Sequence, residues 1–149
     1  MIRRARIPDA RAIHQLLLTY AKDGQLLGRS LAAIYESIRD FYVYEEDGKL
    51  LGIGALAICW EDLAEVRSLA VVPGQQGKGI GRKIVEKCLD EARDLELKRV
   101  FALTYQPDFF RKVGFHDIDK SELPQKVWGD CINCVKFPDC DEEALAINL

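Results

Sequence analysis

A turn rich in glycine is the clearest candidate for ligand binding in this chain. Residues 74–81 read Gly-Gln-Gln-Gly-Lys-Gly-Ile-Gly, and an amphipathic segment of about four helical turns follows them. Glycines at 77, 79 and 81 leave backbone N–H groups uncovered by side chains. The N-terminus of the following helix adds partial positive charge. The turn therefore favours the phosphate groups of a ligand.

The spacing within this turn excludes two common nucleotide sites. A Walker loop has four residues between its first glycine and Gly-Lys-Ser/Thr, whereas two separate Gly74 from Gly77 and Gly79 occupies the hydroxyl position. The dinucleotide fingerprint Gly-x-Gly-x-x-Gly does not match either. The pattern Gln76-x-x-Gly79-x-Gly81 resembles instead the pyrophosphate loop of the GCN5-related N-acetyltransferase (GNAT) family. This resemblance implies acetyl-CoA as co-substrate, with its pyrophosphate bound by Gln76, Gly77, Lys78, Gly79, Ile80 and Gly81.

The same resemblance implies where the rest of the cofactor lies. In that family a bulge separates the fourth strand from the fifth, and the pantetheine arm lies in the gap. Backbone groups of Leu69, Ala70 and Val71 would then pair with pantetheine, and Phe110 would contact the cofactor. An exposed N–H group at the bulge would polarise the thioester carbonyl.

Acetyl transfer to an amine needs a base, because a free amino group is mostly protonated at pH 7. Glu65 lies four residues before Leu69, where the family often has a carboxylate base. Strand alternation predicts that Glu65, Arg67 and Leu69 share one face of the sheet. A solvated ion pair between Glu65 and Arg67 is the alternative reading of the two charged residues.

A proton donor for the departing thiolate is harder to assign. Many family members have tyrosine in a Tyr-x-x-x-Gly-Phe pattern, and here Phe110 stands in its place before Gly114-Phe115. A phenyl ring cannot donate a proton. Tyr105, at the end of the preceding predicted strand, or a water molecule could do so. A packed aromatic side chain is the alternative role for Tyr105.

Further segments resemble the acetyltransferase domain of bacterial N-acetylglutamate synthases, which also tends to lack this tyrosine. They are Gly28-Arg29-Ser30, Phe101-Ala102-Leu103-Thr104 and Leu123-Pro124-x-Lys126. The resemblance implies L-glutamate as acceptor, and two carboxylates require fixed cations. The candidates are Arg29, Arg67 and Lys126, each of which could instead be a solvated surface charge.

The elements that must position these residues follow from local patterns. Apolar stripes and capping signals predict helices at 8–20, 30–38, 79–95 and 107–112. Alternating or continuous apolar runs predict strands at 2–6, 41–46, 49–59, 63–72, 99–104, 113–118 and within 126–137. This order implies an α/β protein with the GNAT fold, in which helices flank a mixed sheet that is splayed between its fourth and fifth strands.

Length, net charge and the N-terminal sequence indicate the general class of the protein. The 149 residues suit one domain, 1–149, with a core of about 1–137 and a short acidic C-terminal tail. The net charge of −3 gives no indication of nucleic acid or membrane as a partner. The N-terminus lacks the apolar stretch of a signal peptide, so we expect a cytoplasmic protein. A homodimer would be common for the family.

The cysteines open a separate possibility. Cys131-x-x-Cys134, Cys140 and His116 could together bind zinc, and the first two could form a redox-sensitive pair. Within a strand, however, two such cysteines point to opposite faces. Ordinary reduced thiols, with no metal, are the expectation.

The leading hypothesis is an amino-acid N-acetyltransferase of arginine biosynthesis that acts by direct transfer in a ternary complex. One alternative is a GNAT enzyme for another small amine or for a protein N-terminus. A second alternative is a non-catalytic sensor that binds acyl-CoA, and a third makes the C-terminal cysteines a metal-dependent interaction surface.

Overall fold

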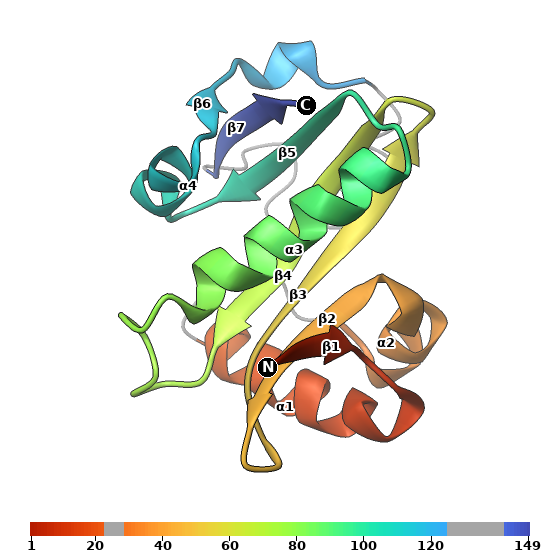
Figure 1. Cartoon of the computed structure of the whole chain (residues 1–149), viewed down its shortest axis with the longest axis vertical. Coiled ribbons are helices and arrows are strands. Elements are labelled where there is room, and N and C mark those ends of the chain that lie inside the picture. Colours follow the sequence, from red (N-terminus) through yellow and green to blue (C-terminus); the bar gives the residue numbers. More distant parts are fainter. Residues whose placement is uncertain (23–28, 125–141) are drawn as a thin grey trace.

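The computed structural model describes residues 1–22, 29–124 and 142–149. Within these residues seven strands form one sheet in the order β1-β2-β3-β4-β5-β7-β6 (Figure 1). Only the β4–β5 pair is parallel, and the other neighbours are antiparallel. The strands are β1 (Ile2–Arg4), β2 (Phe41–Glu46), β3 (Lys49–Trp60), β4 (Leu63–Val71), β5 (Arg99–Thr104), β6 (His116–Asp117) and β7 (Glu143–Asn148).

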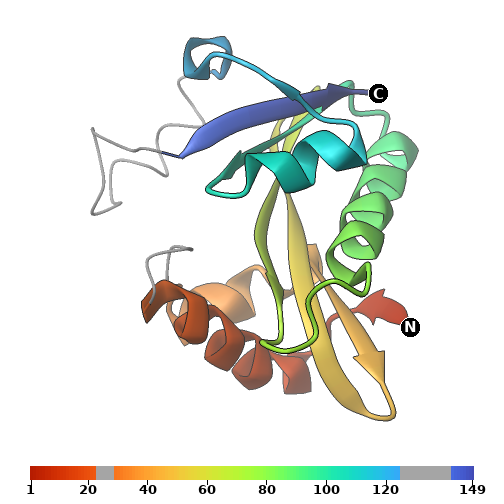
Figure 2. The same ribbon diagram turned by 90° about the vertical axis from the view of Figure 1, so that its left-hand side faces the viewer.

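Helices cover both faces of this sheet, as the view along its edge shows (Figure 2). Helices α1 (Ala10–Lys22) and α2 (Leu31–Glu36) pack on one face, against β2, β3 and β4. Helix α3 (Ile80–Asp94) packs on the other face, and α4 (Pro107–Val113) follows β5. Short 3-10 turns lie at Ile7–Asp9, Ile38–Asp40 and Lys120–Glu122. None of the described helices is long and apolar enough to cross a membrane.

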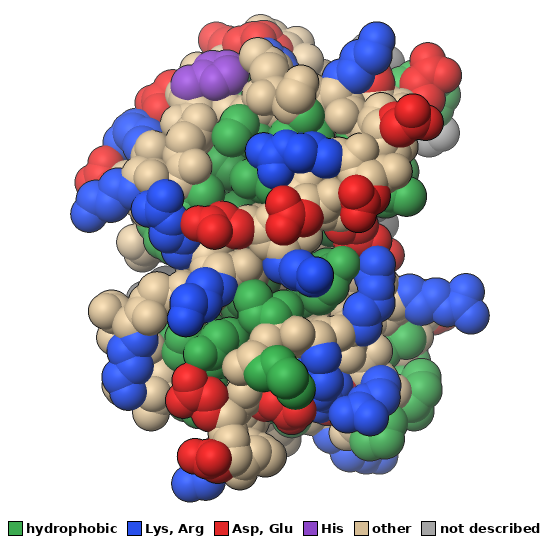
Figure 3. All heavy atoms as spheres, in the orientation of Figure 1, with side chains coloured by type: hydrophobic (Ala, Val, Ile, Leu, Met, Phe, Trp, Pro, Cys, Tyr) green, Lys and Arg blue, Asp and Glu red, His purple; other side chains and the backbone are tan. Residues whose placement is uncertain are grey.

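The spacing of apolar residues explains why α3 lies where it does. All six side chains that the sequence predicts to face the sheet are buried: Ile80, Ile84, Val85, Cys88, Leu89 and Ala92. The opposite side of α3 carries charged side chains of both signs, and Figure 3 shows acidic and basic side chains gathered on this face of the molecule. Two of its ion pairs link Arg82 to Glu86 and Arg93 to Asp90. Helix α3 is therefore held by one apolar stripe, as a helix on a sheet face requires.

Most predicted elements are present close to their predicted bounds. The strands at 41–46 and 99–104 match β2 and β5, and Ser30 caps α2, because its side chain accepts a hydrogen bond from the backbone N–H of Ala33 at 3.1 Å. Asp47 and Gly48 both have positive φ, as a two-residue hairpin turn requires.

The C-terminal end of the core differs from the prediction. The strand expected within 126–137 lies outside the described residues. Residues 143–148, which the sequence analysis left beyond the core, form β7 and insert between β5 and β6. An acidic run precedes this strand, and Ile147 is its only β-branched residue, so local propensity gave little signal for it.

Candidate active site

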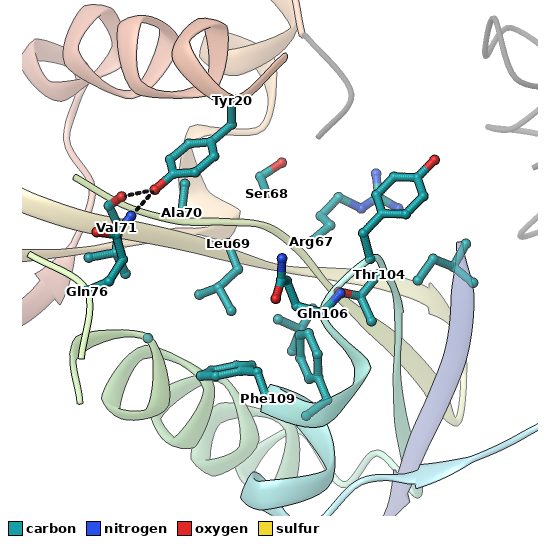
Figure 4. A pocket seen from close by; sticks show the side chains of 15 residues that line it. Tyr20, Arg67, Ser68, Leu69, Ala70, Val71, Gln76, Thr104, Gln106 and Phe109 are labelled. Atoms are coloured by element: carbon teal, nitrogen blue, oxygen red, sulfur yellow. Dashed lines mark hydrogen bonds between the residues drawn. The ribbon is translucent and has the colours of Figure 1, made fainter. Parts of the chain in front are cut away.

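A cleft of about 320 Å³ opens where β4 and β5 separate (Figure 4). The two strands pair only from Leu63–Glu65 to Arg99–Phe101, at their N-terminal ends. Tyr20 of α1, the glycine-rich loop and α4 complete the wall. Eight of the residues predicted from the sequence line this cleft: Arg67, Leu69, Ala70, Val71, Gln76, Gly81, Tyr105 and Phe110.

A bulge in β4 marks the point of separation. Arg67 pairs with Ala55 and Ala70 pairs with Ile53, so β4 has one residue more than β3 across this interval. Ser68, inside it, has φ of +55°, a conformation that is uncommon for a residue with a side chain. A bulge bends its strand and leaves the extra residue outside the ladder. The bulge and the splay agree with the geometry that the GNAT resemblance implies.

The bulge also corrects one prediction. Leu69 does not share a face with Glu65 and Arg67, because the extra residue reverses the alternation of side chains beyond Ser68. Leu69 packs with Val66 in the apolar cluster under α3, whereas Ala55, the partner of Arg67, belongs to the cluster under α1 and α2. The cleft is thus apolar on the α3 side and charged on the α1–α2 side.

Glu65 and Arg67 form an ion pair on that charged side. Arg67 Nη2 lies 2.8 Å from Glu65 Oε1, and the two side chains are only 20% and 13% exposed. The pair considered as an alternative in the sequence analysis therefore exists, but it is largely shielded from solvent. Arg67 reaches the cleft, while Glu65 lies behind it, outside the lining residues.

Arg29 lies just before α2, half-buried, and does not line the cleft. Its charge and that of Arg67 both act on Asp40, at the end of the short turn before β2. Burial raises the pKa of Asp40, and the two guanidinium groups oppose that shift. Arg29 and Arg67 thus act on the same carboxylate. The third predicted cation, Lys126, lies outside the described residues.

Three glycines of the glycine-rich loop have positive φ, a backbone conformation that residues with a side chain rarely adopt. Gly74, Gly77 and Gly79 have φ of +90°, +82° and +80°, and an added Cβ at each would meet no atom within 4 Å. Conformation, not space, therefore requires glycine at these positions. Gly81 is different, because an added Cβ would lie 3.3 Å from the ring of Phe109.

The remaining loop residues predicted to bind the cofactor differ in exposure. Gly77, Lys78 and Gly79 are exposed, and the Lys78 ammonium donates to Gln75 Oε1 at 2.8 Å. The Ile80 side chain is buried under the sheet, so only its backbone can contribute to a ligand site. Gly79 is the N-cap of α3, which directs the first N–H groups of the helix, those without carbonyl partners, toward the loop.

Tyr20 is a cleft residue that the sequence analysis did not find. Its hydroxyl donates to the carbonyl of Val71 and accepts from Gln76 Nε2 at 2.9 Å (Figure 4). In the sequence Tyr20 is one member of the apolar stripe of α1, and only the structure shows its hydroxyl beyond that stripe. Thr104 and Gln106 are further polar cleft residues, and Thr104 Oγ1 accepts from the Gln106 N–H at 2.8 Å.

Phe110 packs as a hydrophobic side chain. Its ring lies 5.1 Å from the rings of both Phe109 and Phe115 in edge-to-face arrangements, and the residue is buried. Tyr105 lies at the cleft, half-buried, directly after β5. Tyr105, the side chain considered for proton donation, therefore lines the cleft, as does Phe110, which has no proton to donate.

The described residues contain no cluster of three or more His, Cys, Asp or Glu side chains suited to a metal ion. His116 is exposed on β6, and the cysteines at 131, 134 and 140 lie outside the described residues. Cys88 is buried, and this burial raises the pKa of its thiol to about 12. Cys88 therefore behaves as an apolar core residue.

Comparison with known proteins agrees with this geometry. The model of the acetyltransferase (GNAT) family matches residues 10–116. An uncharacterized N-acetyltransferase of Chlorobaculum tepidum is 43% identical over 99% of this chain and 96% of its own length. An amino-acid acetyltransferase of Mycobacterium tuberculosis is 43% identical over 87% of this chain and 76% of its own length. In an amino-acid acetyltransferase of Neisseria meningitidis the match is 35% identical and spans 29% of that protein.

Solved structures point the same way. A Mycobacterium tuberculosis protein in complex with CoA has a TM-score of 0.86 and 37% identity, covering 100% of this chain and 99% of that one. N-acetylglutamate synthase from Neisseria gonorrhoeae, complexed with coenzyme A and N-acetyl-glutamate, has a TM-score of 0.91 and 30% identity, covering 100% of this chain and 35% of that one. The splayed sheet, the bulge, the glycine-rich loop and these matches together show an acetyltransferase with acetyl-CoA as co-substrate. The chain belongs to the GNAT family of acetyltransferases.

Proposed function

We propose that this enzyme acetylates the amino group of an amino acid, L-glutamate before others, as in the first step of arginine biosynthesis. Two relatives carry the name amino-acid acetyltransferase, and one solved neighbour holds N-acetyl-glutamate beside coenzyme A. The observation that carries the proposal is the shielded Glu65–Arg67 pair, which puts a carboxylate and a cation beside the β4 bulge. An enzyme of this biosynthetic class would act in the cytoplasm.

Acetyl-CoA would lie along β4. Its pyrophosphate would meet the backbone N–H groups of residues 76–81 at the start of α3, where partial positive charge favours anions. Its pantetheine arm would follow the backbone of Leu69, Ala70 and Val71, at the edge that β5 leaves unpaired. The thioester carbonyl would then come next to the bulge at Ser68, where a backbone N–H can stabilise an oxyanion.

The reaction would be a direct transfer. Glu65, through a water molecule, takes a proton from the ammonium group of the acceptor. The amine nitrogen attacks the carbonyl carbon of the thioester, and the carbon–sulfur bond of the tetrahedral intermediate breaks. The nitrogen passes its second proton through water to the group, Tyr105 or water itself, that protonates the leaving thiolate. The CoA thiolate leaves and takes a proton from Tyr105 or from water. The position of Glu65 outside the residues that line the cleft supports a water molecule between Glu65 and the amine.

The carboxylates of the acceptor would meet Arg67, with Arg29 and Lys126 as further cations. Arg67 engages Glu65 through Nη2, and its planar fork has five N–H donors in all. One arginine can therefore hold Glu65 in place and bind a substrate carboxylate at the same time. This arrangement couples the position of the base to the position of the substrate.

Replacement of Arg67 tests the role of this cation. Arg67→Gln removes the positive charge, so we expect the KM for glutamate to rise at least about 10-fold, the loss of one charge-assisted contact. The KM for acetyl-CoA should stay within about 2-fold, because the cofactor groups lie along other residues. Steady-state kinetics with each substrate varied in turn measures both values.

Arg93→Gln is the matched control, because Arg93 is 53% exposed on the outer side of α3. It should leave both KM values unchanged. An unchanged KM for glutamate in Arg67→Gln, with glutamate turned over normally, would remove Arg67 from the acceptor site.

A further inference from the structure

A chain of three hydrogen bonds connects α1 to the glycine-rich loop. The backbone N–H of Gly74 donates to Gln76 Oε1 at 3.0 Å, and Gln76 Nε2 donates to the Tyr20 hydroxyl oxygen at 2.9 Å. The Tyr20 hydroxyl donates to the carbonyl of Val71 (Figure 4). The chain thus begins and ends on the segment 71–74, and Tyr20 attaches that segment to α1.

The direction of every bond in this chain is fixed by chemistry. A backbone N–H can only donate and a carbonyl can only accept, so the bonds at Gly74 and Val71 each have one possible direction. These two ends orient the Gln76 amide and the Tyr20 hydroxyl between them. A chain with one direction polarises cooperatively, so that its members support one another. Removing the central hydroxyl therefore affects both neighbours.

Two other hydrogen bonds of the loop are internal to it: the Gln75 N–H donates to the Val72 carbonyl at 2.9 Å, and the Lys78 ammonium donates to Gln75 Oε1 at 2.8 Å. Gly74, Gly77 and Gly79 lack side chains, and an added Cβ at each would meet no atom within 4 Å. Gln76, Gly77, Lys78 and Gly79 are exposed to solvent. The ring of Tyr20, in contrast, packs against the core under α1 and α2. Tyr20 can therefore restrict the motion of the loop, because its ring packs against the core and its hydroxyl bonds to Gln76.

Two members of this hydrogen-bond chain would contact two parts of the same ligand. Gln76 belongs to the loop proposed to bind the pyrophosphate, and Val71 belongs to the strand proposed to bind pantetheine. We propose that Tyr20 is a positioning residue for acetyl-CoA: it holds the pyrophosphate loop in a fixed position relative to strand β4. This inference rests on the cofactor site of the proposed function and goes beyond it, since it assigns α1 a part in cofactor binding.

The decisive variant is Tyr20→Phe, which removes the hydroxyl and keeps the packed ring. Without the hydrogen bonds of the Tyr20 hydroxyl, binding of the cofactor must itself order the loop. We therefore expect the affinity for CoA to fall about 5- to 10-fold. The KM for acetyl-CoA should rise by the same factor, while kcat and the acceptor KM stay within about 2-fold. Isothermal titration calorimetry with CoA alone measures the first quantity, and steady-state kinetics the others.

Gln76→Leu and the double variant test whether Tyr20 acts through the loop. If both residues belong to one chain, the double variant binds CoA no more weakly than Gln76→Leu alone. Losses that multiply would show that Tyr20 acts by another route and would overturn the proposal. Gln76 is exposed, so its replacement does not threaten the fold.

Tyr35→Phe is the matched control, because Tyr35 is 37% exposed on α2 and lies outside the cleft. It should bind CoA as the unaltered protein does. Calorimetry with CoA needs no acceptor, so an error about glutamate would not affect this result. Tyr20→Phe with unchanged CoA affinity would overturn the inference while leaving the proposed function in place. No binding of CoA by the unaltered protein would overturn both.

Discussion

Glu65 and Arg67 are two residues apart on β4, and each depends on the other for its position. The 2.8 Å contact between their charged groups orients the carboxylate, and both side chains are mostly shielded from water. Arg67 alone reaches the cleft wall. In the proposed mechanism, the proton of the acceptor amine therefore reaches Glu65 through one water molecule.

Glu65→Gln tests this step, because glutamine keeps the size of the side chain and an oxygen for Arg67. We expect kcat to fall about 100-fold at pH 7, the usual contribution of a general base. The deficit should shrink as pH rises, since more of the acceptor amine loses its proton without help. The measurement is a pH–rate profile of the variant beside the unaltered enzyme.

The control for Glu65→Gln is Glu61→Gln, an exposed carboxylate in the turn between β3 and β4. Its profile should match that of the unaltered enzyme. A deficit of equal size at every pH would mean that Glu65 does not take part in proton transfer.

At the scale of residues, sequence reasoning found those that a motif or a family position marks. Gln76 was predicted in this way, whereas Arg67 was predicted from its charge and Tyr105 from its hydroxyl after a predicted strand, and all three line the cleft. Tyr20 was missed because the apolar stripe of a helix predicts only that the ring is buried. The hydrogen bonds of its hydroxyl to Val71 and Gln76 depend on the tertiary structure. The face of Leu69 was predicted wrongly because strand alternation assumes an unbroken ladder.

The loop between β4 and α3 is the element on which the proposed cofactor site depends. Its glycines at positive φ turn the chain sharply, so that α3 begins right beside the cleft. Because the first N–H groups of a helix have no carbonyl partners, this geometry presents donors to an anion. A change in backbone conformation at Gly79 would redirect those donors.

Gly79→Ala isolates this effect. Since an added Cβ would meet no atom within 4 Å, the cost is backbone strain alone. We expect about 1–2 kcal/mol for alanine in this conformation. The loop can relieve that strain by moving, so the KM for acetyl-CoA should rise about 10-fold, measured by initial rates at saturating acceptor.

Gly48→Ala offers a matched control in the hairpin turn between β2 and β3. Its φ of +76° is close to the +80° of Gly79, and its surroundings are equally open. Both variants should lower the free energy of unfolding by similar amounts, and only Gly79→Ala should change the KM for acetyl-CoA. Equal effects on KM would show that the loop has no special part in binding.

Among the elements, helices and inner strands were predictable from local patterns, the bulge was expected only from the GNAT resemblance, and β7 was not predicted. Apolar residues recur along α3 at helical spacing, and this pattern is typical of a helix with one buried face. The bulge at Ser68 depends on how β4 registers against β3, which is tertiary information. Strand β7 is Glu-Ala-Leu-Ala-Ile-Asn, and its place beside β5 comes from pairing and burial more than from propensity.

The whole molecule consists of two parts of one sheet, joined by the short parallel pair of β4 with β5 and by α3 (Figures 1 and 2). The cleft needs this division, since a fully paired sheet would leave no unpaired edge for a ligand. The part with β5, β6 and β7 must then be stable by other means. Strand β7 supplies them, because it pairs with β5 along all six residues of that strand.

Leu145 is a fully buried side chain of β7 in this part of the sheet. It is 0% exposed in the core under α3, so Leu145→Ala should lower the free energy of unfolding by about 2–5 kcal/mol. Leu149, at 38% exposed, provides the control, and Leu149→Ala should cost less than about 1 kcal/mol. Chemical denaturation of the three proteins measures these values, and equal stabilities would contradict the packing of β7.

The central claim is that the cleft transfers an acetyl group from acetyl-CoA to an amino acid whose carboxylates meet arginine. The most direct measurement follows thiol release from acetyl-CoA with each of the twenty amino acids, and with a few polyamines for comparison. We predict turnover with glutamate well above that with every other acceptor, and lower with glutamine, which has lost the side-chain carboxylate. Turnover with polyamines but not with glutamate, or CoA binding without turnover for any acceptor, would contradict the claim.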